Sequence, residues 1–223
     1  MANLAITYWN QGRWNNAEQL QIKVLDIRKR LLGQVHPDTF QSMANLASTY
    51  RKQERWNEAE QLQIQVLNIS KRVLGEEHPD TLSNISNLVL IYGNQGRWSE
   101  AEQLQIQVIY INRKVLGQEH PDTLNSMTNL ASTYRWQERL NEAEQLESHA
   151  LNMNKRLLGQ KHPQTLTSMA NLASIYYNLG RWSEAEQLQI QILDMTRRVL
   201  GQEHPDTLIN MANLVLTYSG QEK

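Results

Sequence analysis

The sequence predicts an all-α solenoid built from helical hairpins, and two observations lead to that prediction. The first is a fixed period: His-Pro recurs every 42 residues, at His36, His78, His120, His162 and His204, and Asn-Leu recurs on the same step. The second is the apolar pattern inside each period, which follows the 3.6-residue repeat of a one-faced helix and not the alternation of a strand. A period of this length is typical of repeats that pack only on their neighbours.

The repeat at residues 80–121 shows how one hairpin is built. Its first half, helix A, carries apolar residues three and four apart, namely Leu82, Ile85, Leu88, Val89 and Tyr92. Its second half, helix B, does the same with Ala101, Leu104, Val108, Ile111 and Val115. The glycines of Gly93-Asn94-Gln95-Gly96 mark a turn between the two helices.

The helix ends agree with this division. Helix A follows His-Pro-Asp-Thr, where proline suits the first turn and Asp or Thr can cap. Helix B is expected to begin at a Ser99 cap, with acidic residues in the first turn. It closes on Arg113 and Lys114 followed by Gly117, which suit a helix C-terminus. Helix ends therefore account for much of the charge in the chain.

The core positions are nearly constant between repeats. Tryptophan recurs at one position, with Leu140 in the fourth repeat, and its strict spacing favours a place in the hairpin core over a ligand-stacking role. Two turns depart from the pattern, because Glu54 and Glu138 replace the glycine found at Gly96. If that position needs a left-handed backbone, glutamate costs about 1 kcal/mol there; the alternative is that it is an ordinary turn residue.

At these residues the chain resembles a known family. The elements Asn-Leu-Ala, Tyr, Gly-Arg-Trp, Glu-Ala-Glu and Leu-Gly-x-x-His-Pro-Asp-Thr are similar to the 42-residue tetratricopeptide (TPR) repeats of kinesin light chains. Similar arrays form the C-terminal sensor regions of fungal NLR-like STAND proteins. The resemblance implies a right-handed superhelix with helix A on its concave side.

We expect one elongated domain over residues 1–223. Its units are expected at about 1–37, 38–79, 80–121, 122–163 and 164–205, with a terminal helix at 206–219, which makes about eleven helices. The first repeat lacks its own His-Pro-Asp-Thr and the last stops after helix A. This favours a piece of a longer array over a short natural product.

Composition narrows the class of protein. The 22 basic and 23 acidic residues leave a net charge of −1, which argues against a nucleic-acid or anionic-membrane surface. There is no cysteine, hence no disulfide or thiol chemistry. Without an apolar run long enough to span a membrane, or a signal peptide, the expected location is the cytoplasm.

We predict no catalytic residue, no metal site and no cofactor. The five histidines in register cannot share one zinc ion, because packed helices stand about 8–10 Å apart and zinc binds nitrogen at about 2 Å. A histidine at a helix start explains them better. The two glutamates of each Glu-Ala-Glu do not face each other on a helix, so they form no acid/base pair.

The repeats differ most near the end of helix A. The residue after the conserved tyrosine is Trp9, Arg51, Gly93, Arg135, Tyr177 and Ser219 in turn, and the next position includes Lys52 and Trp136. These positions resemble the helix-A residues that line the concave groove of TPR proteins. Exposed positions can simply drift, but aromatic residues beside arginine are typical interface anchors. The predicted groove residues from these positions are Trp9, Arg51, Lys52, Arg135, Trp136 and Tyr177.

A second predicted set is the asparagine ladder, Asn45, Asn87, Asn129 and Asn171. In kinesin-light-chain-like repeats, helix-A asparagines contact the backbone of an extended peptide, and the resemblance implies that role here. An inter-repeat hydrogen bond that satisfies a neighbouring backbone group is an equally good interpretation.

The function we predict is a non-enzymatic protein-interaction module that binds a peptide or a partner surface in the helix-A groove. The parent would be an NLR-like sensor or another adaptor of the kinesin-light-chain type. A structural spacer, or an element that self-assembles head to tail through its open ends, is the rival from another class.

Overall fold

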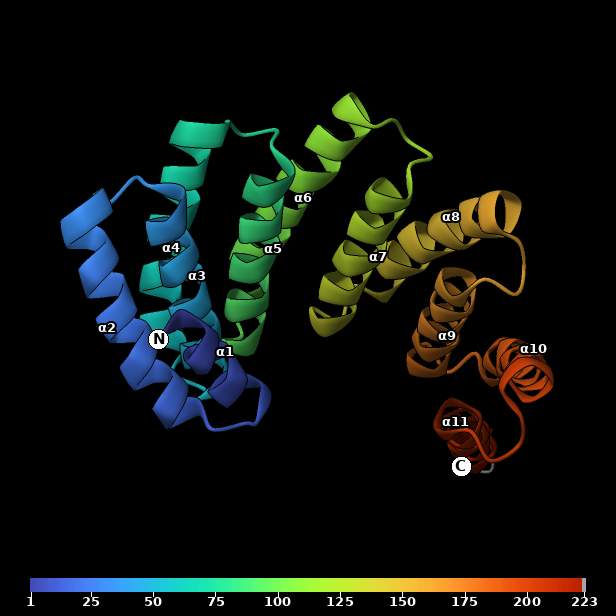
Figure 1. The fold of residues 1–223 in the computed structure, drawn as a ribbon. Helices are drawn as coiled ribbons and strands as arrows, with labels where there is room; N and C mark the ends of the chain where they lie inside the picture. The colour runs from blue at the N-terminus through green and yellow to red at the C-terminus, as the bar shows by residue number, and fades with distance from the viewer. Residues whose placement is uncertain (222–223) are drawn as a thin grey trace. The chain divides into compact units, whose positions relative to one another are not determined.

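The computed structural model describes residues 1–221 and, over that range, eleven α-helices and no strand (Figure 1). The helices are α1 (Ala2–Asn10), α2 (Trp14–Leu32), α3 (Pro37–Lys52), α4 (Trp56–Leu74), α5 (Pro79–Asn94), α6 (Trp98–Val115), α7 (Pro121–Trp136), α8 (Leu140–Leu158), α9 (Pro163–Asn178), α10 (Trp182–Leu200) and α11 (Pro205–Gln221). Odd-numbered helices are the predicted helices A and even-numbered ones the helices B. The all-α fold and the number of helices are confirmed.

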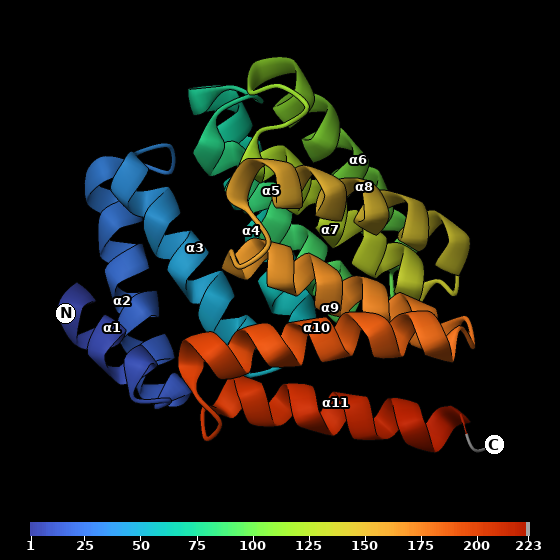
Figure 2. The same ribbon diagram turned by 90° about the vertical axis from the view of Figure 1, so that its right-hand side faces the viewer.

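The chain divides into two compact units, Met1–Val108 and Ile109–Lys223, with the boundary inside α6. In the first unit, α1 to α5 pack in sequence order, each helix on the next. In the second unit, α7 to α11 do the same, and Figure 2 shows α10 and α11 running side by side. In the first unit α3 therefore contacts α2 and α4, and in the second unit α9 contacts α8 and α10.

The core of the first unit lies between successive helices. Met43 and Leu46 of α3 meet Leu25 of α2 and Val66 of α4. The next layer repeats this arrangement one helix pair later, with Ile85 and Leu88 of α5 between Leu67 and Val108. Small residues of helix B are buried as well, for Ala17 and Ala59 are 0% exposed.

The second unit has the same layers, with Leu151, Met169, Leu172 and Ile192 in its last repeat. Two predicted core positions are less deep than expected. The tryptophans at the start of helix B, among them Trp98, are half-buried, because each ring lies at the end of its hairpin and closes the core there. Val115 is 50% exposed and does not belong to the core, since α6 ends at that residue.

Helix A begins with a histidine cap. The Nδ1 atoms of His36, His78, His120, His162 and His204 each accept a hydrogen bond from the backbone N–H two residues on, at 3.2 Å. Proline then occupies the first turn, where its missing N–H costs nothing. A histidine at a helix start was predicted correctly. The prediction of Asp or Thr as the cap was wrong, because the imidazole nitrogen already takes that N–H.

Helix B begins one residue earlier than predicted, with an arginine as the boundary residue. Ser99 lies inside the first turn of α6 and Ser183 inside that of α10, so neither serine is the cap. The acidic residues predicted in that turn serve the boundary arginine instead, since Arg97 Nε donates to Glu100 Oε1 at 2.9 Å. Helix B therefore begins without a side-chain cap hydrogen bond, as at Arg55 and Arg181, and an ion pair joins the boundary arginine to the first turn.

The turn between helix A and helix B needs a left-handed backbone in both forms of the repeat. Glu54 and Glu138 have φ of 60° and 61°, close to the 71° of Gly12, Gly96 and Gly180. The strain predicted for glutamate at this position is therefore present.

Replacing Glu54 with glycine is expected to raise the free energy of unfolding by about 1 kcal/mol, because glycine adopts positive φ without a Cβ clash. Urea unfolding followed by circular dichroism measures the change. Gln11→Gly is the control, because Gln11 lies in the equivalent turn with φ of −83°. It should lower stability, and an equal gain in both variants would contradict the strain argument.

Candidate functional site

Three cavities lie at equivalent places in the array, each between helix A and helix B of one repeat and helix A of the next. We call these cavities slots. The slot of the second repeat is lined by Ala44, Ala47, Ser48, Arg51, Gln63, Asn87 and Ile91. The slot of the fifth repeat is lined by residues three periods later, including Ala170, Ala173, Ser174, Tyr177, Gln189, Asn213 and Thr217. The first repeat has a matching slot with Ala2, Ala5, Gln21 and Asn45.

The slot floors follow from the sequence of the repeat. Alanine on helix A leaves room where a larger residue would fill the space between three helices. Glutamine on helix B points into that space, and asparagine of the next helix A lies at its edge. The slots therefore combine an apolar floor with amide groups, a composition that suits a protein ligand.

In the second repeat, Arg51 occupies most of the slot, which retains a cavity of only about 10 Å³. Its Nη1 donates to Oδ1 of Asn87 at 3.4 Å, so two residues predicted for the groove meet across the slot. Burial lowers the pKa of the Arg51 guanidinium. Within the described residues, its hydrogen bond goes to a neutral amide and not to a carboxylate.

The fifth repeat carries Tyr177 where the second has Arg51, and its slot is larger, about 220 Å³. The Tyr177 ring turns away to stack edge-on against Trp182, with ring centroids 4.8 Å apart. Trp9 of the first repeat stacks in the same way on Trp14, at 5.5 Å. These two predicted groove aromatics are half-buried, and their contacts are within their own hairpins.

In the fourth repeat, Arg135 again reaches across to the next helix A, and we call this position, equivalent to the slot of the second repeat, the slot of the fourth repeat. Its Nη1 donates to Oγ of Ser174 at 2.8 Å. The neighbouring Trp136 is 63% exposed, and the Arg135 guanidinium carbon stands 6.0 Å from its ring centroid. Lys52, at the position of Trp136 in the second repeat, is exposed at the end of α3.

The asparagine ladder is not uniform. Oδ1 of Asn45 accepts from Gln41 Nε2 at 3.1 Å, within its own helix, whereas Asn87 accepts from Arg51. Asn129 is exposed, and Asn171 lies beside the Glu147 carboxyl. The four side chains thus have different surroundings although the sequence repeats.

Glu147 is the residue that the sequence analysis missed. It occupies the slot position of Gln63 in the fourth repeat, is 0% exposed, and accepts from Thr128 Oγ1 at 3.4 Å. Burial raises the pKa of this carboxyl to about 7. Aligning the five repeats would have revealed it as the one acidic residue in a column of glutamines.

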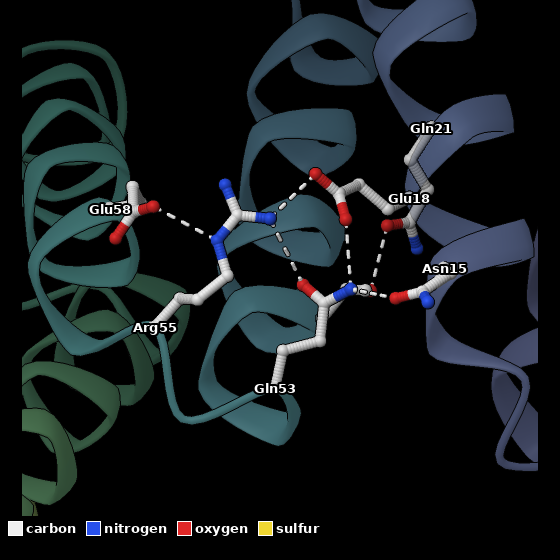
Figure 3. A network of polar contacts seen from close by, with 7 residues as sticks. Asn15, Glu18, Gln21, Gln53, Arg55 and Glu58 are labelled. Atoms are coloured by element: carbon white, nitrogen blue, oxygen red, sulfur yellow. Dashed lines mark hydrogen bonds and ion pairs between the residues drawn. The ribbon is translucent and has the colours of Figure 1, made fainter.

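A second group of arginines, at the hairpin turns, has a different role. Figure 3 shows Arg55 joining two repeats: Nη1 donates to Glu18 of α2 at 2.7 Å and Nε to Glu58 of α4 at 2.9 Å. Gln53 adds a hydrogen bond to Glu18 at 2.8 Å. The guanidinium also covers the Tyr50 ring, 4.2 Å from its centroid.

This turn arrangement recurs with Arg97 and Arg181, which reach Glu60 and Glu144 at 2.7 and 2.8 Å. The hydrogen bonds that Arg55, Arg97 and Arg181 donate to carboxylates raise the pKa of these arginines. The bonds donated by their Nε atoms lower the pKa of the accepting carboxyls, those of Glu58, Glu100 and Glu184. The two glutamates of each Glu-Ala-Glu therefore serve two different arginines. The turn arginines join neighbouring repeats through ion pairs, whereas Arg51 and Arg135 lie at the slots.

Comparison with known proteins places these slots in a known architecture. Models of the tetratricopeptide repeat match residues 1–38, 39–80 and 165–206, and a second such model matches residues 82–156. A solved structure from Podosopora anserina, a putative kinesin light chain with nearly identical TPR-like repeats, is 31% identical with a TM-score of 0.80. The match covers 89% of this chain and 93% of that one.

Two more distant structures share the fold. BtubC (BKLC) from P. vanneervenii is 20% identical with a TM-score of 0.76, over 94% of this chain and 84% of that one. A STAND signal-transduction ATPase with a TPR sensor, from Pyrococcus horikoshii, is 16% identical with a TM-score of 0.73, over 97% of this chain but 32% of that one. No curated protein sequence matches the chain.

Successive helix A/helix B hairpins that stack in sequence order define a helical-repeat protein of the solenoid class. Within that class, the chain belongs to the tetratricopeptide repeat family, with repeats like those of kinesin light chains. Repeats of this family generally form protein-interaction modules. None of the helices in the described part of the chain is both long enough and apolar enough to span a bilayer.

Proposed function

We propose that this protein is a non-enzymatic interaction module whose slot arginines, Arg51 and Arg135, bind acidic side chains of a protein or peptide partner. Each slot is proposed as a site by itself, one around Arg51 and Asn87 and another around Arg135 and Ser174. The asparagine ladder would add amide contacts to the partner's backbone. The proposal needs no cofactor and no nucleic acid.

The contrast between the two kinds of arginine carries this proposal. Arg55, Arg97 and Arg181 have carboxylates as partners, whereas the hydrogen bonds of Arg51 and Arg135 within residues 1–221 go to neutral groups. A partly desolvated guanidinium with only neutral partners gains most from a carboxylate, because charge-assisted hydrogen bonds are about twice as strong as neutral ones. Exposed Trp136 beside Arg135 offers an apolar anchor next to that charge.

The similar STAND ATPase carries its TPR repeats as a sensor, and this gives the proposal a biological context. By analogy, the chain would serve in the cytoplasm as the sensor or adaptor part of a larger NLR-like protein. Its net charge of −1 is compatible with a protein partner.

A peptide-display selection tests the proposed function. Three pools of decapeptides, all containing tryptophan and leucine, are enriched in Asp and Glu, in Ser and Asn, or in Lys and Arg. We expect the acidic pool to be retained most strongly, with affinity falling as salt rises, because exposed charge pairs are screened. Arg51→Gln with Arg135→Gln should weaken retention and flatten the salt dependence.

Arg30→Gln with Arg198→Gln is the matched control. It removes the same charge from two helix-B arginines that are 71% exposed and pair with Asp26 and Asp194. Equal loss of binding in both double variants would mean that net charge, and not the slots, attracts the peptides. Retention of no pool would reject the proposed function.

A self-assembling element is the second candidate, favoured by the exposed apolar face of α11. Leu208, Ile209, Val215 and Leu216 are 53–61% exposed there. Light scattering as a function of concentration distinguishes the two candidates, because an assembling protein gains mass and a monomeric interaction module does not.

A further inference from the structure

The helix-B residue that lines the three cavities is Gln21, Gln63 or Gln189, and the equivalent residues of the third and fourth repeats are Gln105 and Glu147. Glutamine and glutamic acid have nearly the same shape, so the exchange changes charge and hydrogen bonding more than packing. The fourth repeat therefore differs from the others by one ionisable group at the floor of a slot.

Hydrogen bonding in the second repeat shows what this position requires. Nε2 of Gln63 donates to the backbone carbonyl of Asn84 at 3.0 Å and to its Oδ1 at 3.2 Å. Ser168 takes the place of Asn84 in the fourth repeat and lies beside Glu147. A protonated carboxyl can donate one hydrogen bond there, but a carboxylate can only accept.

The surroundings of Glu147 also favour its uncharged form. The side chain is 0% exposed, and within the described residues Oε2 has no hydrogen-bond partner. Hydrogen bonds with Ser168, Asn171 and Thr128 lower the pKa of this carboxyl, but burial raises it by more. An unsatisfied buried carboxylate oxygen is costly, whereas a protonated carboxyl needs fewer donors.

One charged group faces Glu147 from the helices packed against it. That group is Arg135 of α7, since α9 presents Ser168 and Asn171, which do not titrate. On α8 itself, Glu144 one turn earlier is held by Arg181, and His149 is exposed. Among the residues that the structure describes, the charges of this slot are therefore those of Arg135 and Glu147.

We propose that Glu147 is a proton-operated switch on the slot of the fourth repeat. With the carboxyl protonated, Arg135 is the only charge of the slot, which then accepts a ligand carboxylate. With the carboxyl ionised, Glu147 offsets the charge of Arg135, and the slot rejects that ligand. This inference rests on the proposed function for its ligand, but the proton site itself does not.

The switch acts near neutral pH, because burial raises the pKa of Glu147 from 4.5 to about 7. The sign for stability follows. Between pH 4.5 and about 7 the unfolded chain is ionised at this residue while the folded chain is not, so stability falls as pH rises through that window and levels off above it. For binding, a ligand carboxylate raises the pKa further, so affinity falls as the pH passes 7.

Carboxyl carbon NMR of protein labelled at glutamate Cδ tests the proton site without a ligand. The resonance that disappears in Glu147→Gln should titrate with a midpoint near pH 7. A midpoint below pH 5 overturns the proposal. The variant should fold normally, since glutamine is the residue that the other repeats carry.

Thermal unfolding against pH gives a second readout with a matched pair of variants. Glu147→Gln should lose the decline in melting temperature between pH 4.5 and 7, and Gln63→Glu should acquire one in the first unit. If the melting temperature of Glu147→Gln falls over this pH range as much as that of the wild type, another group is responsible for the fall, and the raised pKa is not that of Glu147.

Binding of the acidic decapeptide pool at pH 6 and pH 8 tests the switch. If a bound carboxylate raises the pKa of Glu147 by about one unit, wild-type affinity falls about fivefold between pH 6 and pH 8, and Glu147→Gln stays at the pH 6 affinity throughout. If the carboxyl titrates near pH 7 but no pool binds, the proton site stands and the proposed function fails. Binding that is lost in the arginine variants but does not vary with pH in the wild type leaves the proposed function intact and rejects the switch.

Discussion

Replacing Ile85 with alanine is expected to lower the free energy of unfolding of the first unit by about 3–4 kcal/mol. Ile85 is 0% exposed and packs between α4 and α6 residues, with Leu67 and Val108 among its neighbours. Truncating its side chain to alanine leaves a cavity between α4, α5 and α6, and these helices cannot all move in to fill it. Because repeats couple mainly to their neighbours, the unfolding transition should also broaden.

Ile22→Ala is the control for this substitution. Ile22 lies in the same unit on α2 and is 44% exposed, so the same change of residue creates no cavity. Denaturant unfolding should show a loss below about 1 kcal/mol for it. Similar losses in the two variants would mean that the layers around Ile85 are not packed as described.

Replacing Gly75 with alanine is expected to cost about 2–3 kcal/mol. Gly75 ends α4 with φ of 95° and ψ of 164°, a region that residues with a Cβ rarely enter. No atom lies within 4 Å of a Cβ built there, so the cost would come from the backbone alone. Comparing melting curves of wild type and variant measures it.

Gly96→Ala is a graded comparison. Gly96 has φ of 71°, in the left-handed region where Glu54 already sits at 60°, and it too has open space around a Cβ. We expect a cost of about 1 kcal/mol. If Gly96→Ala cost as much as Gly75→Ala, the loops would be sensitive to any substitution. The difference between the backbone angles of Gly75 and Gly96 would then not determine the cost of replacing glycine.

The 42-residue period predicted most of the fold because every local signal agrees with it. Helical spacing of apolar residues, a proline after His78 and a glycine after helix B each point to the same hairpin. For Glu54, which breaks the pattern, the sequence left two interpretations open, and its φ of 60° is that of the left-handed backbone. Such agreement between local and global preferences is what makes a repeat predictable from one copy.

The errors came where two residues compete for one role. Both Asp38 and His36 can cap α3, and sequence does not show that the imidazole reaches the N–H first. Similarly, Ser99 is a good cap by type, but Arg97 with Glu100 forms the helix start. A periodic pattern also predicts which face of a helix points to the core, but not how deeply each residue is buried. Trp98 was therefore predicted to be a core residue, whereas it is half-buried.

The candidate site was harder to predict because its residues act across repeats. The sequence shows that the position of Arg51 varies between repeats and that the position of Asn87 does not. It does not show that the two side chains meet, because they lie 36 residues apart in different repeats. Nor could it separate Arg51 from Arg55, which differ in their partners and not in residue type. In the sequence, Glu147 differs from the other repeats only as a glutamate where they carry glutamine. The structure shows that this carboxyl is buried, which the sequence did not predict.

The central claim is that slot arginines bind the partner and turn arginines hold the fold. One measurement tests it directly: the affinity for a peptide from the acidic pool of two double variants matched in charge, Arg51→Gln with Arg135→Gln and Arg55→Gln with Arg181→Gln. We expect the slot variant to lose affinity at an unchanged melting temperature, and the turn variant to melt earlier but bind like the wild type below its melting point. Full affinity in the slot variant, or equal loss of affinity in two folded variants, would contradict the claim.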